Sequence, residues 1–274
     1  MADLTLVSCW YNLKNKYNEE TYGKWMSNLI SNVRKFHLII FTDSSGSEII
    51  NRFINDENEN RSHITVVIRE LSELEGYTMK DYWIENHLRN TLLRESISWE
   101  LNMLWSEKIR FVKTACDMGL VKTHWCGWCD IGYFRGRGDD IPVDRIREWP
   151  STKVMDELER DKIYYGLVKN KFVLNDLYNI CSKRNDLGLP EVTIPENQVS
   201  IAGGFFILTT DTIEWWYDTY YRLLHLYLIN RYLVKDDQII VIDCILQNLG
   251  RFKLISEKER GRYDEWFVFQ RFLL

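Results

Sequence analysis

Short apolar runs alternate with longer segments of helical periodicity along most of the chain. Runs rich in β-branched or aromatic residues predict strands at residues 4–10, 36–43, 64–71, 162–168, 200–208 and 251–255. The stretch "THWCGWCDIGYFR", residues 123–135, predicts a further strand that ends at Asp130. Because strands alternate with helical segments, the pattern predicts an open, mostly parallel sheet with helices on both faces.

The segments between these runs predict the helices. Helices are expected at residues 22–33 and 47–55, over residues 80–118 as two helices, and from near Thr210 and near Asp236. The chain shows no internal repeat, and no Pro-rich or Ser/Gly-rich linker divides it. The sequence therefore predicts a single domain over residues 1–274.

Composition narrows the class of protein. Aromatic residues make up 14% of the 274 residues, and such rings suit a cleft for sugars or bases. The net charge is −5 with dispersed Lys and Arg, which indicates no nucleic-acid partner. The sequence has neither a long apolar window nor a leader pattern, so we expect a cytoplasmic protein with no transmembrane segment. Peripheral association with a membrane stays open.

The six cysteines lie mostly inside apolar runs, which predicts buried, reduced thiols. Cys126 and Cys129 have the spacing of a thioredoxin-type pair, but such a pair begins a helix. Here the pair lies in an apolar alternation followed by "YFRGRGDD", which is typical of a loop. A structural zinc site needs four ligands, and the chain has no second Cys-x-x-Cys. The stretch is therefore interpreted as a strand.

The end of this strand is a candidate site for chemistry. Period two puts Trp128 and Asp130 on one face and Cys129 on the other. A carboxylate at a strand end, followed closely by Gly132, can hold an oxygen-preferring cation that bridges two phosphates. The alternative is that Asp130 caps a turn after the strand. The residues alone leave both interpretations open.

A family resemblance adds to this pattern. The motif "GWCDIGYFR" follows "LWSEKIRFVKTA" and precedes "IAGGFFILTTDTIEWWYDTYY" and "KDDQIIVIDCIL". In this order the motifs resemble the HtrL/YibB-like group and, more broadly, nucleotide-sugar transferases of the GT-A fold, over nearly the whole chain. The resemblance implies a Rossmann-type, mostly parallel twisted sheet. It also implies transfer of a monosaccharide from a nucleoside diphosphate sugar, such as a UDP-sugar, to a glycan or lipid-linked acceptor.

The resemblance assigns a metal role to Asp130. It matches the first carboxylate of an Asp-x-Asp motif, which holds Mn²⁺ or Mg²⁺ against the diphosphate, but position 132 is Gly where the usual pattern has a second acid. One carboxylate with phosphate oxygens and water can hold Mg²⁺. A metal-free site is the alternative. Asp139 and Asp140 could lend a second acid, or they form a solvated loop pair.

Two further segments match the family. Gly203 and Gly204 resemble the glycine-rich strand beside the transferred sugar, and consecutive glycines in a strand indicate close approach of another group or a bulge. Asp236, Asp237 and Gln238 resemble the acidic segment that contacts the sugar or the acceptor. Asp237, or Asp236, is the candidate base of an inverting reaction. The alternative for these acids is a helix start, where they complement the dipole.

The remaining predictions concern donor binding. Asp43 resembles residues that contact the nucleoside, and Lys108 could meet phosphate charge, a surface lysine being the alternative. The aromatic residues at 215–221 are expected in the core. Three rival functions stay open: a nucleotidyltransferase or sugar-nucleotide hydrolase, a non-catalytic sugar-nucleotide-binding protein, and a thiol oxidoreductase. The missing second acid is the best support for the non-catalytic alternative.

Overall fold

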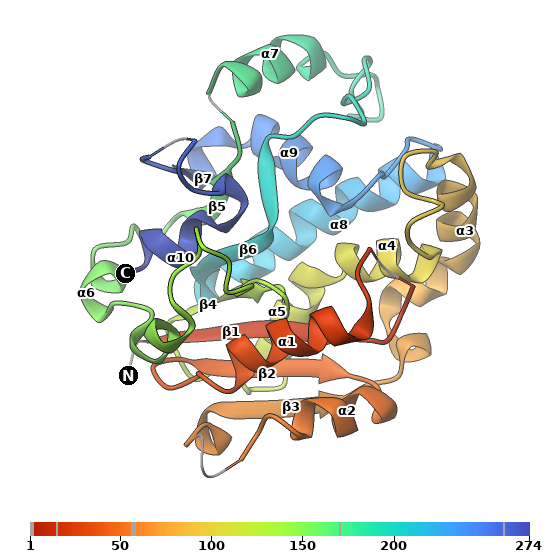
Figure 1. Cartoon of the computed structure of the whole chain (residues 1–274). Helices are drawn as coiled ribbons and strands as arrows, with labels where there is room; N and C mark the ends of the chain where they lie inside the picture. The colour runs from red at the N-terminus through yellow and green to blue at the C-terminus, as the bar shows by residue number, and fades with distance from the viewer. Residues whose placement is uncertain (1–2, 15, 56–58, 170, 260) are drawn as a thin grey trace.

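One seven-stranded sheet forms the centre of the computed structural model, which describes residues 3–14, 16–55, 59–169, 171–259 and 261–274 (Figure 1). The strand order is β3-β2-β1-β4-β6-β5-β7. The strands are β1 (Leu4–Trp10), β2 (His37–Thr42), β3 (Ile64–Ile68), β4 (Trp125–Cys129), β5 (Ile163–Leu167), β6 (Ile201–Thr209) and β7 (Phe252–Ser256). All the strands predicted from the apolar runs are present.

The direction of β6 determines where the sheet can build a site. β6 is antiparallel to β4 and β5, whereas the other neighbouring strands run parallel. The start of β6 therefore lies beside the end of β4, and Cys129 is paired with Phe205. The backbone N–H of Asp130 continues this ladder and donates to the carbonyl of Gly204 at 2.8 Å. The expected α/β class with a mostly parallel sheet is confirmed.

Helices cover both faces of this sheet (Figure 1). They are α1 (Glu19–Ile30), α2 (Ser44–Asn51), α3 (Lys80–Arg89), α4 (Trp99–Ser106), α5 (Lys108–Asp117), α6 (Thr152–Asp156), α7 (Lys171–Cys181), α8 (Ile213–Ile229), α9 (Asp237–Gln247) and α10 (Val268–Phe272). Apolar residues of α4, α5, α8 and α9 form one core with one face of the sheet. Residues of α1, α2 and α10 form a second core with the other face.

The alternation predicted for β4 is confirmed by these two cores. Trp128 packs in the core of α5 and α8, whereas Trp125 and Cys129 pack in the core of α1. The strand has no room for a side chain at Gly127, because a Cβ there would lie 2.1 Å from the carbonyl oxygen of Phe206. β4 is therefore buried on both faces, and Asp130 is the first residue after it that lies at the edge of the core.

The prediction of two helices over residues 80–118 is wrong, because three helices occupy this segment. Residues 91–97 form turns instead of a helix. The chain leaves α3 at Asn90, whose side chain donates to the carbonyl of Lys235 at 2.9 Å. α4 then begins after Ser98, which caps it. A further break at residue 107 makes Lys108 the first residue of α5. α7 was not anticipated from the sequence pattern.

Two composition-based predictions are confirmed. All six cysteines are free, and four of them are buried. The aromatic residues of α8 belong to the core, since Trp216, Tyr220 and Tyr221 are buried there. Within the described residues, the structure contains no helix of the length and apolar character needed to cross a membrane.

Candidate functional site

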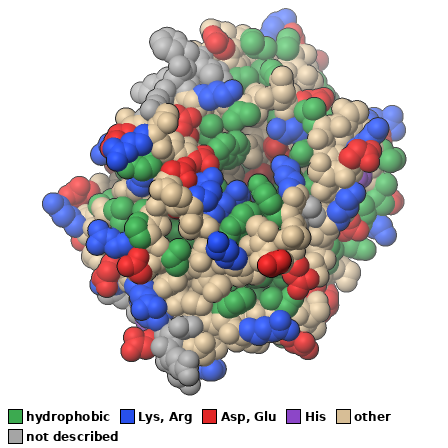
Figure 2. Space-filling model, in the orientation of Figure 1, with side chains coloured by type: hydrophobic (Ala, Val, Ile, Leu, Met, Phe, Trp, Pro, Cys, Tyr) green, Lys and Arg blue, Asp and Glu red, His purple; other side chains and the backbone are tan. Residues whose placement is uncertain are grey.

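Two adjoining cavities open where β4 ends and β6 begins. The larger has a volume of about 410 Å³ and the smaller about 90 Å³. The residues that line both are Tyr22, Trp105, Lys108, Asp130, Gly132 and Arg135. We call the two cavities together the cleft. Figure 2 shows a hollow near the middle of this face of the molecule, with basic and hydrophobic side chains around it.

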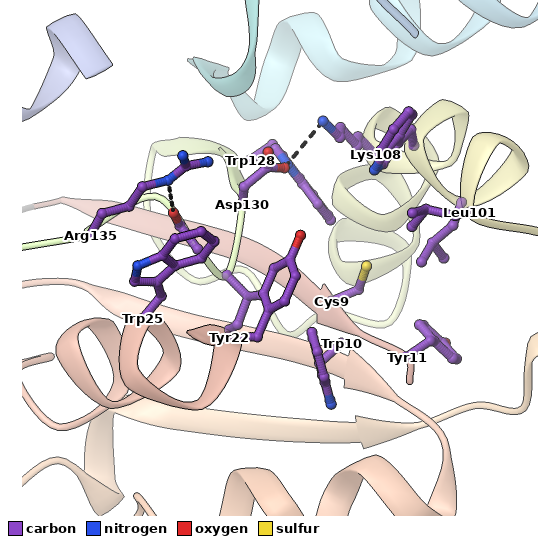
Figure 3. Close-up of a pocket in the computed structure, with 14 residues that line it drawn as sticks. Cys9, Trp10, Tyr11, Tyr22, Trp25, Leu101, Lys108, Trp128, Asp130 and Arg135 are labelled. Carbon is purple, nitrogen blue, oxygen red and sulfur yellow. Dashed lines mark hydrogen bonds and ion pairs between the residues drawn. The ribbon is translucent and has the colours of Figure 1, made fainter. Parts of the chain in front are cut away.

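A buried lysine forms part of the wall of both cavities. The ammonium of Lys108 donates to the carbonyl of Gly203 at 2.8 Å. Its Nζ also lies 3.1 Å from Asp130 Oδ1 and 3.2 Å from Asp237 Oδ2. Three acceptors match the three N–H donors of an ammonium, so the position of the charge is fixed. Figure 3 shows the side chains of Lys108 and Asp130 pointing toward each other.

Burial and these ion pairs shift the pKa values of two of the groups. Burial alone would lower the pKa of Lys108, but Asp130 and Asp237 outweigh it, so this pKa lies above its ordinary value. Burial raises the pKa of Asp237 from 3.8 to about 7; Lys108 opposes this increase, and Asp236 adds to it. Asp237 is therefore a carboxyl group that exchanges its proton near neutral pH, as a general base requires.

Asp130 is held by its neighbours and also faces the cleft. Its Oδ1 accepts a hydrogen bond from Trp128 Nε1 at 2.6 Å, in addition to the contact with Lys108. Its side chain is 43% exposed, whereas that of Asp237 is 7% exposed. Asp130 is thus the accessible acid of this cluster, and Asp237 is the desolvated one.

The glycine pair of β6 makes room for these two carboxylates. A Cβ at Gly203 would lie 2.9 Å from Asp237 Oδ2, and a Cβ at Gly204 would lie 3.2 Å from Asp130 Oδ2. The sequence-based inference that something closely approaches the backbone here is confirmed, and the approaching groups are the two acids. The bulge that the sequence left as the alternative is also present, because Tyr165 of β5 pairs with Phe206 and the next residue, Gly166, pairs with Ala202, so the glycine pair lies in the irregular part of β6.

Aromatic rings line the smaller cavity. They belong to Trp10, Tyr11, Tyr22, Trp25, Trp105 and Trp128. The rings of Tyr22 and Trp25 meet edge to face at 5.2 Å, and Trp10 packs against Tyr22 at 5.0 Å. These contacts fix the rings before any ligand enters. Figure 3 shows Tyr22 and Trp25 rising from α1 on the same side of the cleft as Arg135.

Arg135 lines both the smaller, aromatic cavity and the larger cavity, which contains most of the charged residues. Its guanidinium lies 4.3 Å from the ring of Trp25 and 4.8 Å from the ring of Phe267. Its Nε donates to the carbonyl of Gly132 at 3.3 Å. An arginine packed against two rings is restricted in position, and its planar guanidinium suits a phosphate.

The predicted site residues lie together with one exception. Asp130, Lys108, Gly203, Gly204, Asp236, Asp237 and Gln238 all line the larger cavity. Asp236 and Asp237 also begin α9 as expected, and Asp236 pairs with Lys235 at 3.1 Å. Asp43 is not among the described residues that line the cleft. It precedes α2, and its carboxylate accepts a hydrogen bond from the backbone N–H of Gly46 at 2.6 Å. The catalytic and binding roles of these residues stay predictions.

Two alternatives that the sequence left open are wrong. Lys108 is not a surface lysine, because its side chain is only 9% exposed. Asp139 and Asp140 are not a solvated pair, since the side chain of Asp140 is 1% exposed and pairs with Arg137 at 3.0 Å. Among the described residues that line the cleft, neither Asp139 nor Asp140 is present, so they supply no second acid beside Asp130.

Several cleft residues were not identified from the sequence. They are Tyr22, Trp25, Trp105, Arg135 and Lys235. Trp25 lies in a predicted amphipathic helix, where an aromatic residue is normally assigned to the core. Arg135 lies in a loop with other charged residues, and only its spacing after Asp130 could have singled it out. Such residues become visible only when the tertiary structure brings α1 and the loop after β4 together.

The residues around Asp130 do not fit a resident divalent cation. A second acid at position 132 has no space, because a Cβ at Gly132 would lie 2.8 Å from the ring of Trp25. Within the described parts of the chain, no cluster of three or more His, Cys, Asp or Glu residues could hold a metal ion. Asp130 and the neighbouring Asp237 both already contact the ammonium of Lys108. The expected Mn²⁺ or Mg²⁺ stays a prediction that this donor set does not support.

The cysteine pair of β4 is not placed for thiol chemistry. Cys126 and Cys129 are both buried, and they belong to different cores on opposite faces of the sheet. A hydrogen bond to Cys116 and burial raise the pKa of Cys126, and burial raises the pKa of Cys129. Reactive cysteines require a lowered pKa and access to solvent. This site therefore lacks the properties of a redox pair.

Comparisons with known proteins give one family and several similar structures. The model of a family described as "bacterial protein of unknown function (HtrL_YibB)" matches residues 9–273. No curated protein matches the sequence. The galactosyltransferase LgtC, solved with donor and acceptor sugar analogs, is 8% identical with a TM-score of 0.47, and the match covers 92% of this chain and 73% of that chain.

A second similar structure is the core-mannan synthase A of Aspergillus fumigatus in its Mn/GDP form. It is 11% identical with a TM-score of 0.48, and the match covers 98% of this chain and 82% of that chain. At these scores the likeness does not decide the function of the present chain. The residues of the cleft must supply that argument.

Proposed function

The chain belongs to the HtrL_YibB family of bacterial proteins of unknown function, and from its cleft we propose that it is a glycosyltransferase. It moves a monosaccharide from a nucleoside diphosphate sugar to a glycan or lipid-linked acceptor. The description of the family names no activity, so the proposal depends on the residues of the cleft.

The observation that supports the proposal is the joining of an aromatic cavity to a charged one. Aromatic rings that line a cavity bind the flat face of a nucleobase. The cations that line the larger cavity, Lys16, Lys108, Arg135 and Lys235, suit the two phosphates beside it. The acids that line it, Asp130, Asp236, Asp237 and Asp264, suit the hydroxyl groups of a sugar. A nucleotide sugar has these three parts, a base, a diphosphate and a sugar.

The size of the aromatic cavity favours a UDP-sugar as the donor. Its volume is about 90 Å³, much less than the 410 Å³ of the charged cavity. A pyrimidine has one ring and a purine has two, so the smaller cavity is better matched to uracil. The larger cavity leaves room for the diphosphate, the sugar and the acceptor hydroxyl.

The chemistry assigns one role to each of two groups. In an inverting reaction, the acceptor hydroxyl loses its proton to Asp237 while its oxygen bonds to the anomeric carbon. The bond from that carbon to the diphosphate oxygen breaks, and the electron pair leaves with the diphosphate. Lys108 stabilises this negative charge because its ammonium is fixed in the wall of the cleft before the reaction begins.

Ligand binding tests the donor class. The melting temperature is measured with UDP-, GDP-, CMP- and dTDP-sugars, each with and without Mn²⁺ or Mg²⁺. We expect the largest increase with UDP-sugars. Product analysis then separates the rival functions: a nucleoside diphosphate and a glycosylated acceptor support the proposal, whereas pyrophosphate released from a nucleoside triphosphate and a sugar 1-phosphate would indicate a nucleotidyltransferase. Binding without turnover on any acceptor would indicate a non-catalytic protein, and binding of none of the four would contradict the proposal.

A substitution at Asp130 tests the site. Asp130→Ala should abolish transfer, because it removes one of the three acceptors that hold the ammonium of Lys108. The protein should stay folded, since this side chain is 43% exposed. Asp218→Ala, on the exposed side of α8, is the matched control for loss of one carboxylate. Full activity in Asp130→Ala would exclude this residue from the reaction.

A further inference from the structure

We propose that Lys108 and Arg135 take the place of a divalent cation beside the donor diphosphate, Arg135 by hydrogen bonds to the phosphate oxygens and Lys108 by its fixed charge, so that donor binding needs no metal. This inference depends on the proposed function, because it identifies the groups that bind the donor phosphates. It departs from the cation that the sequence resemblance implies at Asp130.

The first argument concerns the space around Asp130. The ring of Trp25 fills the position that a side chain at residue 132 would need, since a Cβ on Gly132 would lie 2.8 Å from its Cε3. The second acid is therefore excluded by packing and not only missing from the sequence. Since the described residues form no group of three or more His, Cys, Asp or Glu that could hold a metal, this is a poor site for a resident divalent ion, which takes several oxygen ligands.

The second argument concerns charge. The Nζ atom of Lys108 lies 3.1 Å from Asp130 Oδ1, and the same oxygen accepts from Trp128 Nε1 at 2.6 Å. A divalent cation on Asp130 would lie beside an ammonium that has three acceptors and is buried. A divalent cation and an ammonium that contact the same carboxylate repel each other. The positive charge that a cation would bring to this carboxylate is already supplied by the chain itself.

The third argument concerns the second cation. Arg135 lines both the smaller cavity, proposed for the nucleobase, and the larger cavity, proposed for the diphosphate. The rings of Trp25 and Phe267 hold its guanidinium at 4.3 and 4.8 Å. Within the described residues its Nε is the nitrogen that has a hydrogen-bond partner, the carbonyl of Gly132. The terminal nitrogens can therefore bind phosphate oxygens as a fork.

Together these groups form a cationic clamp, which we define as Lys108 and Arg135. The clamp lies on either side of Asp130, and Figure 3 shows both side chains directed at the region around this carboxylate. Lys108 supplies a fixed charge, and Arg135 supplies two donors in a plane. The clamp takes a nucleoside diphosphate, with the base toward Trp10 and Tyr22.

Calorimetric titration of the unmodified protein tests the inference directly. UDP and GDP are titrated into protein stripped with EDTA, and again with added Mn²⁺ or Mg²⁺. We expect the Kd of the preferred diphosphate to change by less than about threefold between these conditions. A gain of more than about tenfold with metal would overturn the clamp while leaving the proposed function in place. No binding under any condition would instead contradict the proposed function.

Substitution of the clamp gives the second test. Arg135→Gln and Lys108→Met should each weaken UDP by at least tenfold in EDTA, and Mn²⁺ should not restore the loss. Arg145→Gln, at an exposed arginine outside the cleft, is the matched control. Uridine, which has no phosphate, should bind Arg135→Gln as it binds the unmodified protein, so a folding defect is distinguished from a lost phosphate contact. An unchanged Kd for UDP, or a loss that Mn²⁺ reverses, would overturn the proposal.

Discussion

Replacement of Asp237 by Asn should change how the stability of the protein depends on pH. Burial raises the pKa of this carboxyl group from 3.8 to about 7 in the folded protein. Between pH 4 and pH 7 the folded state therefore keeps a proton that the unfolded chain has lost. Because the unfolded state binds fewer protons in this window, the free energy of unfolding falls as the pH rises.

The magnitude follows from the shift in pKa. A difference of about 3 units at about 1.4 kcal/mol per unit corresponds to about 4 kcal/mol. The contribution of protonated Asp237 to the free energy of unfolding is fully present below about pH 4 and is lost above about pH 7. The Asp237→Asn variant cannot titrate at this position, so its free energy of unfolding should lack this decrease. Relative to the unmodified protein, the variant should gain about 4 kcal/mol between pH 4 and pH 8.

Urea unfolding followed by circular dichroism at several pH values measures this difference. Subtraction of the two curves removes the contribution of the other titrating groups that the substitution leaves unchanged. The Asp218→Asn variant controls for the loss of an exposed carboxylate. Parallel curves for Asp237→Asn and the unmodified protein would refute the raised pKa. They would also remove the main physical reason to assign the base to Asp237.

Two further substitutions test other parts of the site. Gly203→Ala should reduce the turnover of transfer at least tenfold, because its Cβ would lie 2.9 Å from Asp237 Oδ2. Gly23→Ala, where a Cβ meets nothing within 4 Å, should leave the turnover unchanged. Replacement of Cys126 and Cys129 by Ser should lower the melting temperature but preserve the specific activity of the folded protein, because both thiols are buried in the cores. Equal turnover in the two glycine variants, or inactivity of the folded cysteine variant, would contradict these assignments.

The strands and the place of Asp130 were predictable because they depend on local patterns. The alternation of apolar residues defined β4, and the glycine pair signalled a close approach to the backbone of β6. The first helix residue Asp237 was also expected at a helix start. These features need only the period of a strand or the chemistry of a helix end.

The arrangement of the clamp was not predictable, because it depends on contacts between distant segments. Lys108 was a candidate for phosphate contact with a surface lysine as the alternative, and only the break at residue 107, which directs it toward β6, excludes the alternative. The contact between Trp25 and Gly132 joins residues that are far apart in the sequence. Asp43 illustrates the reverse case. The polar turn after β2 resembles a ligand site in the sequence, but in the structure the side chain of Asp43 caps α2.

The contact between Trp25 and Gly132 also limits how the site can change in evolution. A mutation that restores an acid at position 132 would first meet the indole ring. A mutation that shortens Trp25 alone would remove the platform under Arg135. The chain would have to acquire both changes together before a two-acid site could form. Descendants of this protein are therefore expected to keep the glycine, the tryptophan and the arginine as one inherited unit.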